Sequence, residues 1–215
     1  MPAKLLEITA LAINAKPALR FVVAPTDLDI IATAASNLGL GISSLPIFLN
    51  RADSQWALLT KRDTGDGAVL VALTQDNSAD EMARSELSNP QEAGIRLGYP
   101  RCCAQAVSRI AALGPNWPWV FLEEAMITGP LDARLNRFAA MWGGIGLLGE
   151  LFPCSLRCVE AAKYADVLYN SANTLGLRRL AAAAVADALA PVRVSTNGII
   201  TKGENGDGRK VSFKW

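Results

Sequence analysis

The four cysteines of this 215-residue chain fall into two short segments. The first, Leu97–Cys103, reads LGYPRCC, and the second, Phe152–Cys158, reads FPCSLRC. Each has an aromatic residue, a proline and then cysteine. Thiolates bind zinc and iron–sulfur clusters and also act as nucleophiles, so two such segments indicate one cysteine site. Its candidate cofactor-binding and metal-ligating residues are Cys102, Cys103, Cys154 and Cys158.

We expect the proline of each segment to lie in the first turn of a helix, where its missing N–H costs nothing. All four sulfurs then lie at or near two helix N-termini, whose unpaired N–H groups and dipole favour a thiolate. Cys154 and Cys158 are four residues apart and would share one face of a helix. Cys102 and Cys103 are adjacent, so they converge on one centre only in an irregular first turn.

The residue types favour a metal, and the spacing leaves its identity open. Four thiolates without histidine suit an iron–sulfur cluster, with zinc as the alternative. The spacing differs from the C-x-x-C of zinc ribbons and from both ferredoxin patterns. Two interpretations do not involve a metal. The cysteines can be reactive thiols. Alternatively, they fill the core, since free cysteine is among the most buried residue types. A shared site requires the two pairs to approach within about 7 Å between Cα atoms, the outer limit for a disulfide.

Composition excludes several classes of function. The chain has no histidine, which removes every Ser–His or Cys–His dyad and every His-ligated metal. Its net charge is +1 and its basic residues are dispersed, so we expect no nucleic-acid partner. No secretory signal is visible, and the most apolar stretch, residues 141–152, is too short to span a bilayer. We therefore expect a cytoplasmic protein without a membrane partner, in a compartment where disulfides are rare.

Apolar patterning predicts an α+β fold with a small N-terminal mixed sheet, a helical middle that carries the cysteine site, and a short C-terminal β-hairpin. We expect residues 1–77 to form a small α/β lobe, residues 78–190 the helical cysteine-bearing region, and residues 191–215 the hairpin. All three belong to one continuous fold. The predicted strands span residues 20–24, 42–49 (at an edge), 55–61 and 68–74, the last two joined as a hairpin by residues 63–67. The main predicted helices span residues 28–38, 155–175 and 177–190, with two more between 78 and 97.

Other residues are candidates for contact with a substrate. Glu123 and Glu124 can supply an acid or a base to a pocket, although adjacent glutamates on a helix are usually one solvated and one paired. Tyr99 and Arg101 flank the first cysteine pair and can contact a substrate anion. Alternatively, Tyr99 packs beside the helix start and Arg101 points to water.

The pattern Leu-Gly-Tyr-Pro-x-Cys-Cys, followed by a helix and later by Pro-Cys-Ser-x-x-Cys, resembles a family of uncharacterised, largely prokaryotic proteins, domain of unknown function 483. The resemblance covers Leu97–Cys103, Phe152–Cys158 and the helical stretch between about residues 90 and 190. It implies that the four cysteines form one site, and it carries no activity over to this chain. The family commonly has an acidic residue where this chain has Arg101.

Three functions fit such a cysteine site. The leading hypothesis is an enzyme with an iron–sulfur cluster or another metal at two converging helix N-termini, acting on a small polar substrate as a Lewis acid if one thiol is not a ligand. The second is a non-catalytic module in which structural zinc or buried thiols hold two helices together and a surface binds a protein partner. The third is a metal-free enzyme that uses its thiols in disulfide redox chemistry or as nucleophiles.

Overall fold

The computed structural model describes residues 4–49, 59–60, 67–112, 132–136, 145–190, 192–194 and 200–202. Helices and antiparallel sheets both form in this part of the chain, which confirms the predicted α+β class. The chain divides into two compact units. One consists of residues 16–98, and the other joins residues 1–15 to residues 99–215.

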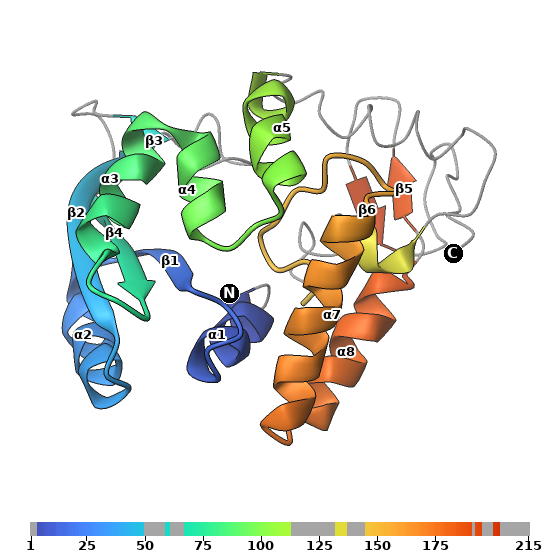
Figure 1. The fold of residues 1–215 in the computed structure, drawn as a ribbon, viewed down its shortest axis with the longest axis horizontal. Coiled ribbons are helices and arrows are strands. Elements are labelled where there is room, and N and C mark those ends of the chain that lie inside the picture. The colour runs from blue at the N-terminus through green and yellow to red at the C-terminus, as the bar shows by residue number, and fades with distance from the viewer. Residues whose placement is uncertain are drawn as a thin grey trace. The chain divides into compact units, whose positions relative to one another are not determined.

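The unit of residues 16–98 is built on a four-stranded sheet in the order β1-β4-β2-β3 (Figure 1). Its strands are β1 (Ala18–Val23), β2 (Gly41–Leu49), β3 (Leu59–Thr60) and β4 (Gly67–Thr74). Strand β4 is an almost continuous apolar run, and every residue after its first is buried, as expected for a central strand. The helices α2 (Leu28–Asn37) and α3 (Ala79–Ser88) pack against β2 and β4.

Three predictions about this sheet are wrong: its mixed pairing, its hairpin and the edge position of the strand at residues 42–49. Every described strand pair is antiparallel, so the sheet is not mixed. The described part of the strand expected at 55–61 is β3, which pairs with the end of β2 instead of forming a hairpin with β4. The turn signal at 63–67 is local, whereas pairing is decided by which apolar faces are buried together. Strand β2 pairs with β4 along most of its length and with β3 only at Phe48 and Leu49, so it lies inside the strand order.

Helices α3 and α4 (Pro90–Arg96) belong with the sheet and not with the cysteines. Asn89 caps α4, because its side chain accepts the N–H of Glu92 at 3.2 Å. The buried Lys16 ammonium donates to the carbonyl of Leu97 and so ties the first residues of the unit to its last ones. These compact units therefore have other boundaries than the predicted regions, which were 1–77, 78–190 and 191–215. That the regions form one continuous fold stays a prediction.

The second unit contains α1 (Leu5–Ala12), α5 (Arg101–Ala112), α7 (Val159–Thr174) and α8 (Arg178–Ala188). Both α1 and α8 pack along α7, and the short 3-10 helix η5 (Ala133–Leu135) contacts α7 and α8 (Figure 1). Many of the buried residues of α7 and α8 are alanines, whose small side chains let helix axes approach closely.

The C-terminal hairpin is present in its described residues. Strands β5 (Val192–Val194) and β6 (Ile200–Lys202) pair antiparallel, as predicted. Among the helices in the described ranges, none has both the length and the apolar character needed to cross a bilayer.

Candidate metal centre

The first cysteine pair lies in the first turn of α5. Pro100 was predicted to lie in the first turn of this helix but stands immediately before it. Its carbonyl accepts the N–H groups of Cys103 and Ala104 at 2.9 Å each. These bonds begin the helix at Arg101. Cys102 and Cys103 are therefore placed at a helix N-terminus, as predicted.

The second cysteine pair does not lie on a helix, contrary to prediction. Helix α7 begins at Val159, with Cys158 as its N-cap and Cys154 in the preceding loop. The Ser155 hydroxyl oxygen accepts the N–H of Arg157 at 2.9 Å, and the Ser155 carbonyl accepts the N–H of Cys158 at 3.2 Å. These local bonds form a turn where helix was expected, because serine side chains compete with the helical backbone for its N–H groups.

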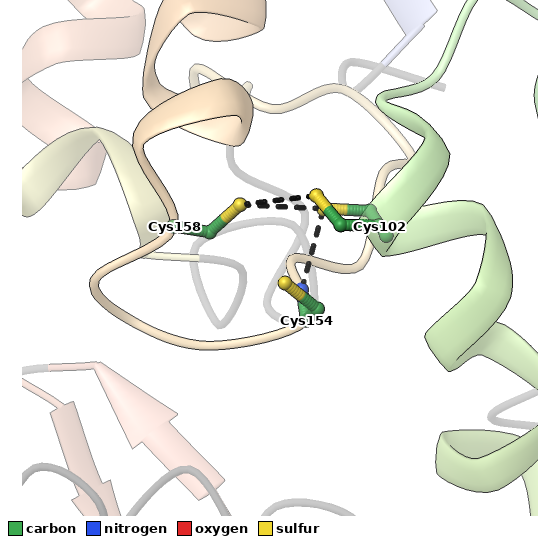
Figure 2. Close-up of side chains that lie close together, drawn as sticks. Cys102, Cys154 and Cys158 are labelled. Carbon is green, nitrogen blue, oxygen red and sulfur yellow. Dashed lines mark hydrogen bonds between the residues drawn. The ribbon is translucent and has the colours of Figure 1, made fainter.

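All four sulfurs nevertheless converge (Figure 2). The Sγ of Cys102 lies 3.9 Å from that of Cys103 and 3.6 Å from that of Cys158, and the last two are 3.7 Å apart. With Cys154 included, the four sulfur atoms lie within 4.8 Å of one another. The four cysteines can thus hold a metal ion, although α5, a loop and the start of α7 supply them separately.

The sulfurs are free thiols at these separations, since a disulfide bond is only about 2.05 Å long. The sulfur atoms are close enough to bind one ion, as the metal hypothesis requires, while the Cα separation of about 7 Å stays a prediction. Each of the four cysteines therefore contributes to a single cluster, and none lies in a separate core.

The four side chains differ in exposure and in their contacts. Cys103 is buried with 1% of its surface exposed, Cys102 is exposed, and Cys154 and Cys158 are intermediate. The N–H of Cys154 donates to the Cys103 sulfur at 3.4 Å, and the N–H of Ala161 donates to the Cys158 sulfur at the same distance. Such N–H···S bonds stabilise negative charge on sulfur.

The environment separates the acidities of the thiols. Burial raises the pKa of Cys103 far above its ordinary value, and the other cysteines add to the rise. Burial also raises the pKa of Cys154 to about 12. Burial opposes ionisation of Cys158 too, but the N–H of Ala161 and hydrogen bonds from the other cysteines outweigh it and lower its pKa. In the metal-free protein, Cys158 is therefore a more favourable thiolate than Cys103 or Cys154.

A buried carboxylate network that the sequence reasoning missed lies in the same unit. Glu7 is fully buried in α1, and its Oε1 accepts hydrogen bonds from the hydroxyl groups of Tyr99 at 3.2 Å and Tyr164 at 3.0 Å. The Lys4 ammonium lies 4.0 Å from Glu7 Oε2 and 2.5 Å from Glu150 Oε2. The available signal was a single charged residue within the mostly apolar run of residues 5–12.

The remaining candidates have different outcomes. Tyr99 contacts Glu7 and stacks edge-on against Tyr164, with ring centroids 5.6 Å apart, so it is part of the buried network. Arg101 is exposed, as its alternative interpretation expected. Glu123 and Glu124 lie outside the described residues. Comparison of the chain with protein-family models, curated proteins and solved structures finds no significant match.

Proposed function

We propose that the four cysteines bind one metal ion in a tetrahedral tetrathiolate site, and that zinc is the ion that fits best. The observation that carries the proposal is the distance between the sulfurs. Four ligands at a Zn–S distance of about 2.3 Å stand about 3.8 Å from one another at the corners of a tetrahedron. The separations of 3.6, 3.7 and 3.9 Å among Cys102, Cys103 and Cys158 match that edge.

The same distances favour a single ion over the iron–sulfur cluster of the leading sequence hypothesis. In a four-iron cluster each thiolate binds a different iron, so its ligand sulfurs stand farther apart than four ligands of one ion. A spread of at most 4.8 Å among all four sulfurs is too compact for that arrangement without movement of the loop that carries Cys154. A single iron bound by four thiolates has the same shape as the zinc site and is distinguished from it by colour.

The function supported best is a metal-stabilised domain. An ion held by the first turn of α5, the loop residue Cys154 and the N-cap of α7 joins segments that are distant in sequence. Structural zinc sites use four protein ligands and contribute directly to folding. Reduced thiols require a reducing compartment, which agrees with the expected cytoplasmic location. The resemblance to domain of unknown function 483 remains a proposal that agrees with one four-cysteine site.

The test is metal analysis of the full chain, purified under anaerobic and reducing conditions. We expect one zinc per chain and no acid-labile sulfide. After exchange into Co²⁺, we expect the intense visible and near-ultraviolet bands of tetrahedral cobalt bound by thiolates. Replacement of any one cysteine by serine changes that spectrum, whereas Thr174→Ala, at the end of α7 farthest from Cys158, leaves one metal bound with the spectrum unchanged.

Two results would count against this function. Iron accompanied by stoichiometric sulfide replaces the single ion with a cluster. A reduced chain that takes up neither Zn²⁺ nor Co²⁺ removes the metal centre and leaves the thiol-based hypothesis.

A second candidate function is an enzyme in which Cys102 leaves the metal and opens a coordination position for a small polar substrate. The exposure of Cys102 favours it, because the other three cysteines are partly or fully buried. Three remaining thiolates then hold the ion, which acts as a Lewis acid. Titration of the Co²⁺ protein with azide decides: a shift of the visible bands shows an accessible position, and an unchanged spectrum shows a closed, structural site.

A further inference from the structure

Glu7 joins the segments that supply the four cysteines. Its Oε1 accepts the hydroxyl of Tyr99, which precedes the first turn of α5, and the hydroxyl of Tyr164 on α7. A Cβ placed on Gly149 would lie 2.6 Å from Glu7 Cγ, so the backbone of the loop that leads to Cys154 passes directly over the carboxylate. Glu7 is therefore packed among all three ligand-bearing segments.

The short sequence distances make this contact relevant to the metal. Tyr99 stands three residues before Cys102, and Tyr164 stands six residues after Cys158. Gly149 and its neighbour Glu150 stand a few residues before Cys154, and Glu150 is tied by an ion pair to Lys4 of the same N-terminal segment as Glu7. A shift of any of these anchors is transmitted to a sulfur through at most about two helical turns or a short loop.

We propose that Glu7 is a positioning residue for the metal centre, which holds the three cysteine-bearing segments in register through Tyr99, Tyr164 and the loop at Gly149. The inference rests on the proposed metal function and adds a determinant that lies outside the cysteine segments. A carboxylate suits this role because one oxygen accepts two hydroxyl donors at once, which a buried apolar side chain does not do. Packing alone would hold the helices together without fixing where each begins.

The substitutions that test this keep the size of the side chains. Tyr164→Phe and Tyr99→Phe each remove one hydroxyl from Glu7, and Glu7→Gln replaces the carboxylate with an amide. Tyr169→Phe, on the same helix α7 but outside the Glu7 network, is the matched control. Each full-length variant is loaded with Co²⁺ under reducing conditions, and its affinity is measured by competition with a chelator at a temperature far below its melting point.

We expect Tyr164→Phe to bind Co²⁺ about tenfold more weakly than the wild type, at the lower end of the range for residues that orient metal ligands, and Glu7→Gln to have a smaller effect because its amide oxygen still accepts hydroxyl donors. Their visible bands shift or lose intensity because the sulfurs leave tetrahedral positions. Tyr99→Phe weakens binding in the same way, because it removes the other hydroxyl that Glu7 accepts. Tyr169→Phe behaves as the wild type.

The outcomes separate the two proposals. Tyrosine variants that melt at a lower temperature yet keep wild-type affinity and spectrum show a purely structural network, and the positioning role is overturned. If Glu7→Gln does not fold, the two tyrosine variants decide by themselves. A wild-type chain that binds no Co²⁺ overturns the metal centre and this inference with it, whereas normal binding by wild type and variants alike overturns the inference alone.

Discussion

Replacement of Cys103 by serine will destabilise the metal-free protein, and the same replacement of its neighbour Cys102 will not. The two residues are adjacent, but Cys103 is 1% exposed whereas Cys102 is exposed. The Cys103 sulfur also accepts the N–H of Cys154 at 3.4 Å. A serine oxygen sits closer to its own Cβ than sulfur does, so it reaches this N–H poorly and brings a buried hydroxyl that needs a partner.

The magnitude follows from these contacts. A buried polar group with a poor hydrogen bond costs about 1–3 kcal/mol of stability. A surface substitution such as Cys102→Ser changes stability by less than about 0.5 kcal/mol. With a urea m-value of roughly 2 kcal/mol/M, a difference of about 1–2 kcal/mol between the variants separates their unfolding midpoints by about 0.5–1 M.

Urea unfolding followed by circular dichroism, with a chelator and a reductant present, measures the two midpoints. The chelator removes any bound metal, so that the comparison reports the burial of each thiol and not the loss of a proposed ligand. Equal midpoints for Cys102→Ser and Cys103→Ser would refute the reasoning, since they would mean that the burial of Cys103 has no energetic consequence in the absence of metal.

Two further predictions concern the Glu7 network and use urea unfolding as the measurement. Gly149 has φ +57° and a Cβ there would meet Glu7 Cγ at 2.6 Å, whereas Gly39 has φ +66° and nothing within 4 Å. We expect Gly149→Ala to lower the free energy of unfolding by about 2–4 kcal/mol. Gly39→Ala should lower it by only about 1–2 kcal/mol, because it strains the backbone without a clash. Similar losses would show that the contact with Glu7 is easily relieved. Burial raises the pKa of Tyr164 well above its ordinary value of 10.0, and the charge of Glu7 adds to the rise. As the pH rises, the unfolded chain therefore loses this proton before the folded chain does. The contribution of protonated Tyr164 to the free energy of unfolding is complete below pH 10 and is lost progressively above it. Above pH 10 the wild type should therefore lose stability faster than Tyr164→Phe. Parallel loss in the two proteins would contradict the prediction.

The parts of the fold that were predictable carry their signals within a few residues. The start of α5 follows from Pro100, and the cap of α4 follows from Asn89 and its spacing to Glu92. The buried strand β4 follows from its apolar run, which predicts a strand whatever its partners are. Which strand β3 pairs with is decided by contacts distant in sequence, and the local turn signal predicted the wrong partner.

The Glu7 network was missed for the same physical reason. Nothing near Glu7 in sequence shows that Tyr99 and Tyr164 will bring their hydroxyl groups to it, since each is more than ninety residues away. A glutamate in an apolar run is equally compatible with an exposed position on an amphipathic helix. The position of Tyr99 predicts a ligand contact or a packing residue, and its hydrogen bond to a buried carboxylate is revealed only by the tertiary structure.

The cysteine site shows that a correct grouping can rest on a partly wrong mechanism. All four cysteines were predicted to share a site because both pairs follow a proline at an expected helix start, with Cys154 and Cys158 one turn apart on the second helix. Helix α7 starts after them, so that spacing cannot explain why Cys154 and Cys158 approach the first pair. What brings them there is the turn at Ser155, which lets the chain fold back before α7 begins. A loop that supplies one ligand and an N-cap that supplies another are less rigid than a helical face, and this is why the site depends on supports such as Glu7 that lie far from the cysteines in sequence.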